Sequence, residues 1–359
     1  MVGPRNALGW AGEPLESSER PGGLSRTASG RARSQDLEQM DLTEDQLIAA
    51  IRRVISGAGP EVIVGPGDDA AVVRSGAGEL VLTTDAMVEG VHFRTDLTTP
   101  RDLGYKAVAV NVSDVAAMAA SPRFALCSLT LPASTEAAWV VELAGGMREC
   151  CDEFALSLVG GNLSRGEELA IVVTVTGEVV PGRAVRRDGA RPGDRLVVTG
   201  SLGGSAAGLR LASQRSWSDV ERDALKRYMR PIPRVGEAGV LSGHGATSMM
   251  DISDGLALDL SRLCDASGVG ARVEIAGIPA HPAATRAEAL GGGEDYELLA
   301  TLPDLDAVEE SRSALREGFG VSLSDIGAII EEGLLAVDED GQEGPLTAEG
   351  TMEGWDHFR

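Results

Sequence analysis

Aromatic residues, histidines and cysteines are all scarce in this chain of 359 residues. Aromatic side chains make up 3% of the sequence, and there are 4 histidines and 4 cysteines. The cysteines form neither a CxxC pair nor a zinc-binding spacing, which argues against a zinc module and for small core residues in a reduced, cytoplasmic chain. They are Cys127, Cys150, Cys151 and Cys264.

Positive charge and long apolar runs are also lacking. The formal net charge is −23, so binding to nucleic acid or to an anionic membrane surface through a basic face is not expected. No apolar run approaches the roughly 20 residues of a membrane span, and no signal-peptide core is visible near the N-terminus. The phosphate-binding motif GxxxxGK[ST] is absent, as are the HRD and DFG motifs of protein kinases, so neither of these nucleotide-binding classes applies.

The length and the change in composition along the chain predict three parts. Residues 1–39 are rich in Gly, Ser, Pro, Arg and Glu and show little periodicity, so we expect a disordered N-terminal extension. The helical pattern that follows Met40 predicts the start of the folded body. We expect an N-terminal domain over 40–180 and a C-terminal α/β domain over 181–359, joined through a turn-rich segment.

Strand-like and helix-like segments alternate through both predicted domains, which indicates mixed α/β architecture. Pro100 follows Thr99, a plausible N-cap, so a helix is predicted to begin there. Helices are predicted at 100–119, 136–154, from 203 and from 255. Strands are predicted at 61–64, 70–74, 79–84, 124–131, 169–177, 195–199, near 271–275, at 296–302 and ending near Asp251.

Six aspartates stand in four short segments, several of them where a strand is predicted to end. They are Asp68 and Asp69 in GDD, Asp85 in TTD, Asp114 in NVSD, and Asp251 and Asp254 in DISDG. Each alone is explained by helix capping or a turn, and Asp68 and Asp254 fit that role best. Capping does not explain Asp114 inside a predicted helix, or Asp85 at the end of a strand beside two threonines.

Together these aspartates favour magnesium. Hard oxygen donors without histidine or thiolate suit Mg²⁺, which keeps few protein carboxylates per ion and fills its other positions with water and phosphate oxygens. Six aspartates would hold more than one ion. That arrangement suits phosphoryl transfer, in which metal ions neutralise the oxygens of the moving group.

Other glycine-rich and polar segments fit either a purely structural role or a ligand-binding role. The glycine loop at 200–208 lacks GxGxxG spacing and fits a packing turn better than a dinucleotide site. The pair Gly160–Gly161 would allow close approach of backbone to a ligand. Glu294, after three glycines, fits a solvated turn as well as a site, and His92 alone fits an ordinary partly buried histidine.

Taken in order, these segments resemble the thiamine-monophosphate kinase family. The matching segments are GDDAAVV, TTDAMVEGVHF, DLGYKAVAVNVSDVAAMAASP, LTLP, LVGGNLSRG, GRAVRRDGARPGD, VTGSLGGSAAGL, MDISDGLALDL, GGEDYELL and WDHF. They cover most of residues 60–358, and residues 1–39 match nothing in the family. The resemblance implies the two-domain fold of the aminoimidazole-ribonucleotide-synthetase superfamily, with the N-terminal domains paired in a homodimer and the active site in a cleft near that interface.

The resemblance also implies an activity and a set of site residues. The implied reaction is direct, in-line transfer of the ATP γ-phosphate to thiamine phosphate, with ATP as co-substrate and several Mg²⁺ ions. Asp85, Asp114 and Asp251 are the implied catalytic residues. The implied Mg²⁺ ligands are Asp69, Thr83, Thr84, Asp85, Asp114, Asp251 and Asp254, with Asn162 at a further metal position. The implied ATP contacts are Gly161, Asn162, Arg187 and Ser253, and the implied thiamine phosphate contacts are His92, Glu294 and Trp355.

One position departs from the family pattern. The family has GGD where this chain has GGN, so Asn162 replaces an aspartate. An asparagine still offers a carbonyl oxygen but no charge, so we expect weaker binding of one Mg²⁺.

Two alternatives accompany this interpretation. The first is another ATP-dependent enzyme of the superfamily, such as aminoimidazole ribonucleotide synthetase or selenophosphate synthetase. The latter expects a reactive Cys or selenocysteine near an early Lys, and the region before GDD has neither. The second is a non-catalytic protein that binds ATP or thiamine phosphate, with Asn162 marking lost catalysis.

Overall fold

The computed structural model describes residues 62–64, 71–75, 78–338 and 340–346. The expected extension over residues 1–39, the helix after Met40, and the site residues Asp69 and Trp355 lie outside the described residues, as does Asp68.

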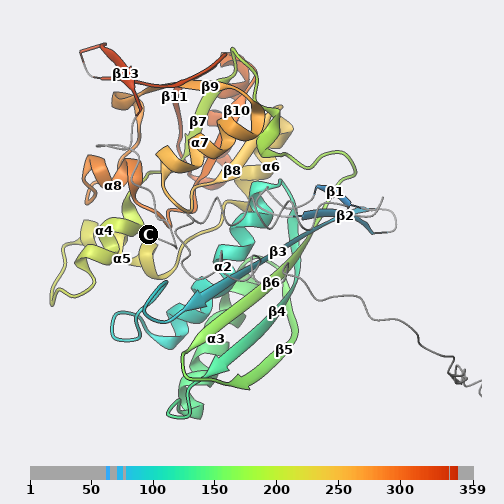
Figure 1. Cartoon of the computed structure of the whole chain (residues 1–359), viewed down its shortest axis with the longest axis vertical. Helices are drawn as coiled ribbons and strands as arrows, with labels where there is room; N and C mark the ends of the chain where they lie inside the picture. The colour runs from blue at the N-terminus through green and yellow to red at the C-terminus, as the bar shows by residue number, and fades with distance from the viewer. Residues whose placement is uncertain (1–61, 65–70, 76–77, 339, 347–359) are drawn as a thin grey trace, which may run out of the picture. The chain divides into compact units, whose positions relative to one another are not determined.

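The described segments form mixed α/β architecture with two sheets, as the alternation of patterns predicted (Figure 1). The strands are β1 Val62–Val64, β2 Ala71–Ser75, β3 Gly78–Val88, β4 Ser121–Leu131, β5 Ser157–Arg165, β6 Ala170–Val179, β7 Arg195–Thr199, β8 Ser248–Asp251, β9 Gly270–Glu274, β10 Leu298–Leu302, β11 Leu323–Ile330, β12 Leu334–Val337 and β13 Glu343–Pro345. The helices are α2 Pro100–Ala117, α3 Ala137–Glu153, α4 Gly204–Leu211, α5 Asp219–Met229, α6 Val235–Gly243, α7 Leu256–Ser267, α8 Arg286–Gly291 and α9 Leu305–Phe319, with 3-10 turns η1 Arg187–Gly189 and η2 Ile275–Gly277.

The first sheet has the order β1-β2-β3-β6-β4-β5. All its neighbours are antiparallel except β4 and β5, which run parallel. The helices α2 and α3 cover one face of this sheet (Figure 1). On β6, buried residues alternate with partly exposed ones, because successive side chains point to opposite faces and only one face meets the helices.

Helix α2 begins as predicted and is buried almost all round. The Thr99 hydroxyl accepts a hydrogen bond from the backbone N–H of Asp102 at 3.1 Å, and Pro100 starts the helix. Its run of Ala and Val gives no polar stripe, which is typical of a helix packed on several sides. At Gly104 a Cβ would lie 1.9 Å from the carbonyl oxygen of Leu143. The backbones of α2 and α3 therefore approach closely only because glycine stands there.

The second sheet has the order β13-β12-β9-β11-β7-β10-β8. One group of buried residues, on the side of α7 and α8, includes Leu260 and Ile326. Another includes Leu241 and Val308, from α6 and α9, and also Ala116 and Ala117 at the end of α2. The end of α2 is thus part of a core that lies mostly in the second half of the chain.

Two expected elements are wrong in ways that matter for the site. Strand β3 continues through Asp85 to Val88, because β6 pairs with it residue for residue from Glu79 to Val88. Asp85 therefore lies inside a strand rather than at its end. The GGN segment is not a loop: it forms part of β5, an edge strand of the first sheet.

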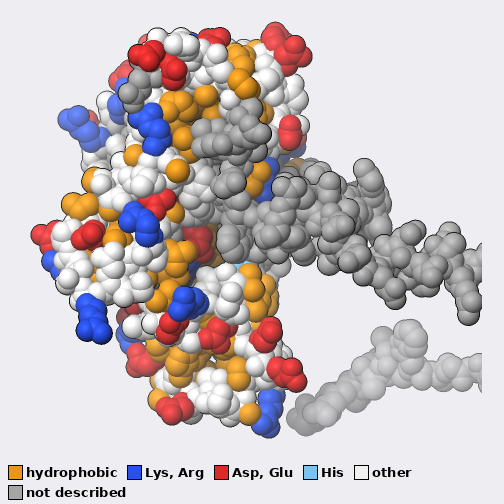
Figure 2. Space-filling view, turned by 60° about the vertical axis from the view of Figure 1, so that its left-hand side comes forward, with side chains coloured by type: hydrophobic (Ala, Val, Ile, Leu, Met, Phe, Trp, Pro, Cys, Tyr) orange, Lys and Arg blue, Asp and Glu red, His pale blue; other side chains and the backbone are white. Residues whose placement is uncertain are grey.

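Surface charge is of both signs. Acidic and basic side chains are interspersed over the face shown in Figure 2. Within the described residues, no helix has the length and apolar character needed to cross a membrane.

Candidate active site

Three polar side chains of helix α2 form hydrogen bonds with β3, with β8 and with the loop before β10. The Thr83 hydroxyl, on β3, donates to Asp114 Oδ2 at 2.6 Å. The Ser113 hydroxyl donates to Asp251 Oδ2, on β8, also at 2.6 Å. Lys106 Nζ donates to Glu294 Oε2 at 2.9 Å. One buried helix thus brings together residues from both sheets.

The position of Asp114 is not explained by helix stability. It lies in the last turn of α2, where a carboxylate faces the negative end of the helix macrodipole and is mildly destabilising. Its hydrogen bond from Thr83 instead fixes the carboxylate between α2 and β3. Thr83 and Asp85 are two residues apart on β3, so their side chains share one face of the strand.

Asp251 is the most deeply buried of the predicted site carboxylates that the structure describes, with 1% of the residue exposed. It ends β8, as predicted, and a buried carboxylate requires compensation from hydrogen bonds or positive charge. The Ser113 hydroxyl gives part of that compensation.

The buried Tyr296 is influenced electrostatically by four of the predicted site carboxylates. Burial raises the pKa of the Tyr296 hydroxyl well above its usual value, and the negative charges of Glu294, Asp85, Asp251 and Asp114 raise it further. These four residues come from β3, α2, β8 and the loop before β10. The structure therefore brings all three predicted catalytic aspartates into one electrostatic neighbourhood, together with Glu294.

The loop that carries Glu294 is held in an unusual backbone conformation. Glu294 and Tyr296 have φ values of 65° and 52°, which are uncommon for residues other than glycine. The loop keeps this shape through backbone bonds to the segment after β8: Glu294 N donates to Ser253 O at 2.7 Å, and Tyr296 N donates to Ile252 O at 2.9 Å. The GEDY and DISD motifs thus form one unit, which excludes the solvated turn that had remained open.

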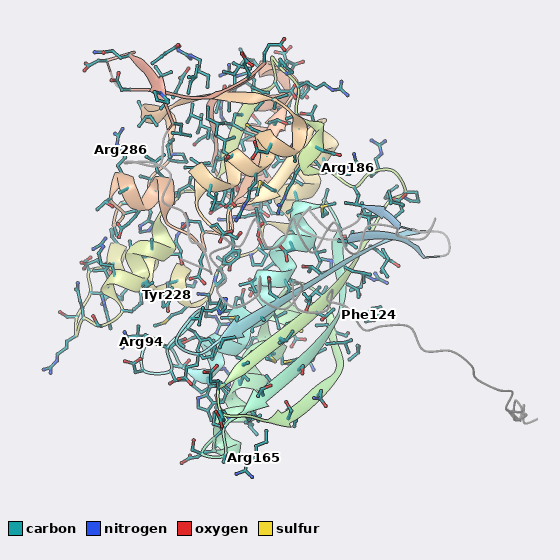
Figure 3. All side chains as sticks on the ribbon, in the orientation of Figure 1. Arg94, Phe124, Arg165, Arg186, Tyr228 and Arg286 are labelled. Carbon is teal, nitrogen blue, oxygen red and sulfur yellow. The ribbon has the colours of Figure 1, made fainter. Side chains whose placement is uncertain are left out.

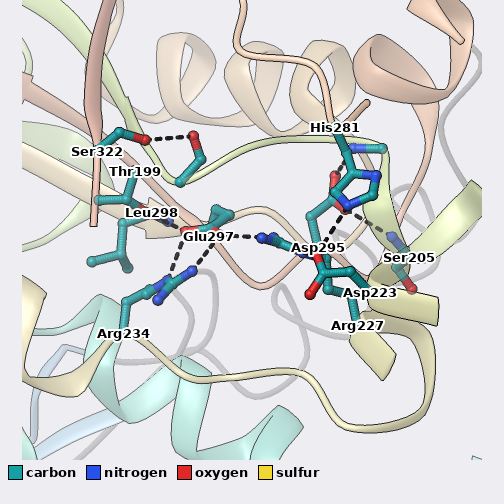
Figure 4. A network of polar contacts seen from close by, with 12 residues as sticks. Thr199, Ser205, Asp223, Arg227, Arg234, His281, Asp295, Glu297, Leu298 and Ser322 are labelled. Carbon is teal, nitrogen blue, oxygen red and sulfur yellow. Dashed lines mark hydrogen bonds and ion pairs between the residues drawn. The ribbon is translucent and has the colours of Figure 1, made fainter. Parts of the chain in front are cut away.

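Asp295, between these two residues, serves the fold. Its carboxylate accepts hydrogen bonds from the backbone N–H groups of Gly203 at 2.6 Å and Ser205 at 3.3 Å (Figure 4). Burial raises its pKa to about 7. The start of α4 is therefore occupied by a protein carboxylate, which agrees with the packing role predicted for the glycine loop at 200–208.

A second polar group surrounds the start of α7. Asp259 Oδ2 accepts from the backbone N–H groups of Ser253 at 3.0 Å and Asp254 at 2.9 Å. Burial, and then the charge of Asp254, raise the pKa of Asp259, while Arg262 and Arg187 act in the opposite direction. Arg187 and Ser253 thus belong to the same region.

The capping role considered for Asp254 is wrong. The N-cap of α7 is Gly255, without a side-chain hydrogen bond, and the Asp254 carboxylate instead forms an ion pair with Arg262. Asp259, in the first turn of the helix, is the residue that organises the loop. A carboxylate in a first helical turn was a visible signal for it.

His92 and Thr84 each form a hydrogen bond with a backbone group of a strand in the first sheet. His92 Nδ1 accepts from the backbone N–H of Val88 at 3.0 Å, so Nδ1 carries no proton and a neutral ring has its proton on Nε2. The Thr84 hydroxyl donates to Val173 O at 3.0 Å on β6. Thr84 points to the face of β3 opposite to Thr83 and Asp85, so the structure does not bring its hydroxyl to the carboxylates.

Gly161 and Asn162 lie apart from this group. Asp85 is in register with Val173 on β6, then with Cys127 on β4, then with Gly161 on β5. Three inter-strand steps place Gly161 about 14 Å from Asp85, too far for a shared ion in one chain. At Gly161 a Cβ would lie 1.7 Å from Cys127 O, so close packing on β4 explains why glycine stands there.

Within the described residues, no three His, Cys, Asp or Glu side chains lie close enough together to hold a metal ion by themselves. Sequence reasoning missed Lys106, Tyr296, Asp259 and Arg262. Lys106 and Tyr296 carry no local signal of their own, because their importance comes from partners distant in the sequence.

The chain matches two family models in succession. Residues 67–179 match the AIR synthase related protein N-terminal domain, and residues 191–339 match the corresponding C-terminal domain. Thiamine-monophosphate kinase of Escherichia coli K12 is 37% identical over 332 residues, covering 88% of this chain and 98% of that protein. The chain belongs to the thiamine-monophosphate kinase family.

Further members support this family assignment. Thiamine-monophosphate kinase of Bacillus subtilis is 38% identical over 253 residues, covering 67% of this chain and 78% of that protein. The solved structure of AaThiL complexed with AMPPCP and TMP superimposes with a TM-score of 0.76 at 34% identity, covering 89% of this chain and 99% of that one. Hydrogenase maturation protein HypE, at 18% to 20% identity, shares the fold alone. The resemblance to the thiamine-monophosphate kinase family is therefore confirmed.

Proposed function

We propose that this protein transfers the γ-phosphoryl group of ATP to thiamine phosphate, giving thiamine diphosphate and ADP. Membership of the thiamine-monophosphate kinase family and the likeness to a protein solved with AMPPCP and TMP support this function. The observation in this chain that carries it is that two adjacent residues of α2 reach both sheets: Ser113 donates to Asp251 on β8, and Asp114 accepts from Thr83 on β3, two residues from Asp85.

The residues present fit magnesium. The hydroxyls of Thr83 and Ser113 hold Asp114 and Asp251 near the end of α2, so carboxylate and hydroxyl oxygens from both sheets are present there, and such hard donors suit Mg²⁺. When bound, Mg²⁺ would neutralise the phosphate oxygens of the moving group. The residues that we propose to hold it are Asp69, Thr83, Asp85, Asp114, Asp251 and Asp254.

The protein's own groups bind and orient. The acceptor is a phosphate oxygen that is already anionic at neutral pH, so the reaction needs alignment and charge neutralisation more than a general base. The hydroxyls of Thr83 and Ser113 hold two of the carboxylates in place. We propose that Gly161, Arg187 and Ser253 contact ATP, and that His92, Glu294 and Trp355 contact thiamine phosphate.

Incubation of the purified protein with ATP, Mg²⁺ and thiamine phosphate tests the function. The expected products are ADP and thiamine diphosphate in equal amounts, with no ADP when thiamine phosphate is omitted. Saturable binding of both ligands without turnover would replace this proposal with the non-catalytic binding protein. Loss of turnover when Mg²⁺ is removed by EDTA, and its return on adding Mg²⁺ back, would identify the metal.

A second copy of the chain is the partner that we propose for the exposed face of β4 and β5. Phe124 and Leu126 are exposed there, by 49% and 48%, and Phe124 projects outward from the sheet (Figure 3). Every residue of β5 is exposed, and β5 is an edge strand. Apolar patches and unpaired strand edges of this kind are features of protein–protein interfaces.

The variant Leu126→Glu is expected to be monomeric in sedimentation experiments at concentrations where the unmodified protein is a dimer, because a charge would be buried at the interface. Leu305→Glu is the matched control, since Leu305 is a similarly exposed leucine on α9, away from this face. A monomeric unmodified protein, or a Leu126→Glu dimer of equal affinity, would contradict the pairing.

The dimer would also give Asn162 a role, since Asn162 lies on β5 at that face and is too far from Asp85 in its own chain. Restoring the family residue with Asn162→Asp is expected to lower the half-saturating Mg²⁺ concentration by roughly tenfold, because added ligand charge strengthens binding of divalent cations. Ser164→Asp adds the same charge two residues along the same strand face and is expected to leave it unchanged. An equal effect of both variants would show a general field effect and refute a ligand role for Asn162.

We also infer a cytoplasmic location. Its support is the use of ATP as co-substrate and the four cysteines, all buried and unpaired.

A further inference from the structure

Lys106 is a buried cation with two partners in the second half of the chain. Its side chain is 4% exposed. Its ammonium donates to Glu294 Oε2 at 2.9 Å and lies 4.4 Å from the centre of the Tyr228 ring. A buried ammonium is costly unless it is paired, so these two contacts are what make a lysine tolerable inside α2.

Lysine itself is rare in this protein. The chain has 32 basic residues, of which only Lys106 and Lys226 are lysines and the rest are arginines.

The ring under Lys106 is held rigidly. Tyr228 lies in the last turn of α5. Two residues later, Arg230 donates to Glu149 Oε2 at 2.8 Å and lies 4.1 Å from the centre of the Tyr105 ring on α2. Arg234 then donates to Glu297 Oε2 at 2.7 Å. The segment 228–234 is thus attached to α2 and α3 at one end and to the strand after the Glu294 loop at the other.

Only one of the two carboxylate oxygens of Glu294 is hydrogen-bonded to Lys106. Lys106 takes Oε2, and among the described residues no hydrogen bond to Glu294 Oε1 is present. The loop backbone around Glu294 is already fixed by its bonds to Ser253 and Ile252, so the side chain is the part whose direction Lys106 decides.

We propose that Lys106 is a positioning residue for the substrate. It holds the Glu294 carboxylate in one orientation and shares its charge, so that the other oxygen meets the cationic substrate. This rests on the proposed function, in which Glu294 contacts thiamine phosphate, whose thiazolium ring is positively charged. Lys106 acts through Glu294 and does not touch the reacting phosphates.

Kinetics of Lys106→Met test this role, since Met keeps the length and apolar stem but removes the charge. Loss of a charged hydrogen bond predicts a KM for thiamine phosphate raised about tenfold or more, with the KM for ATP and kcat each within about threefold. Lys106→Arg is expected to recover most of the affinity, because arginine can pair with Glu294 and stack on Tyr228. The control is Lys226→Met, an exposed lysine on α5, with unchanged kinetics.

An unchanged KM for thiamine phosphate in Lys106→Met would overturn the proposal, as would equal damage in the Met and Arg variants, which would show that size alone matters. If the unmodified protein turns over no thiamine phosphate, the proposed function fails instead, and the two failures are thus distinguished.

A spectroscopic test needs no variant of Lys106. Labelling lysine with ¹³C at Cε gives two side-chain NMR signals, one for each lysine. The Lys106 signal is expected upfield of the Lys226 signal, because Lys106 lies over the Tyr228 ring, and this shift should be lost in Tyr228→Leu. Thiamine phosphate should move the Lys106 signal and leave the Lys226 signal in place. If the chemical shift of the Lys106 signal changes neither in Tyr228→Leu nor on addition of thiamine phosphate, the positioning role is refuted.

Discussion

Replacing Asp114 by asparagine is expected to lower kcat by about 10²- to 10³-fold, the usual effect of removing one electrostatic group from an active site. The carboxylate lies among Asp85, Asp251 and Glu294 around Tyr296, where its negative charge would bind Mg²⁺. Asparagine has nearly the same shape and can still accept the Thr83 hydrogen bond through its carbonyl oxygen. The charge is therefore the one property that the substitution removes.

Folding should survive this substitution. Asp114 is only partly buried, and its charge is unfavourable at the C-terminal end of α2. The midpoint of chemical denaturation is accordingly expected to stay constant or rise slightly. Asp152→Asn, which removes an exposed aspartate from the last turn of α3, is the matched control and should keep full turnover. Turnover within about threefold of the unmodified protein in Asp114→Asn would remove Asp114 from the catalytic group.

Glu297→Gln is expected to be the more damaging substitution for stability. Glu297 is 1% exposed and accepts from Arg234 Nε at 2.7 Å and from the Thr199 hydroxyl at 2.8 Å, while Arg227 approaches to 3.5 Å (Figure 4). Neutralising it leaves Arg234 buried with only Glu237 as an acidic partner among the described residues. Breaking a buried ion pair in this way costs about 3–5 kcal/mol.

Urea denaturation measures this loss. Glu309→Gln on α9 is the matched control, since it removes an exposed ion pair with Arg312 and should change the free energy of unfolding little. The double variant Glu297→Met/Arg234→Met should be less destabilised than Glu297→Gln, because no unpaired charge remains. A Glu297→Gln protein as stable as the control would show that the network in Figure 4 contributes nothing to folding.

Local sequence patterns predicted most of the secondary structure that positions the site. The predicted start of α2 is correct because Thr99 and Pro100 act through bonds to adjacent residues. The end of β3 and the presence of β5 were missed for the opposite reason. Residues 86–88 and the glycines of β5 become strand because β6 and β4 offer partners, and pairing across a sheet is not visible along one strand.

The residues of the candidate site divide in the same way. Asp85, Asp114 and Asp251 stood out because carboxylates beside apolar runs are unusual in a short stretch. Lys106 did not stand out, since a lysine in a helix is ordinarily exposed. Its partner Glu294 is 188 residues away in the chain.

By itself, the sequence determined the mixed α/β class and the kinase family, and it predicted the acidic residues of the candidate site, because these follow from residue types in fixed order. Only the tertiary structure decided which of them meet. It gathered three aspartates and Glu294 around Tyr296, placed Thr84 on the opposite strand face, and set Gly161 about 14 Å from Asp85. The physical reason is that packing of α2 between distant segments, and not local spacing, fixes where side chains come together.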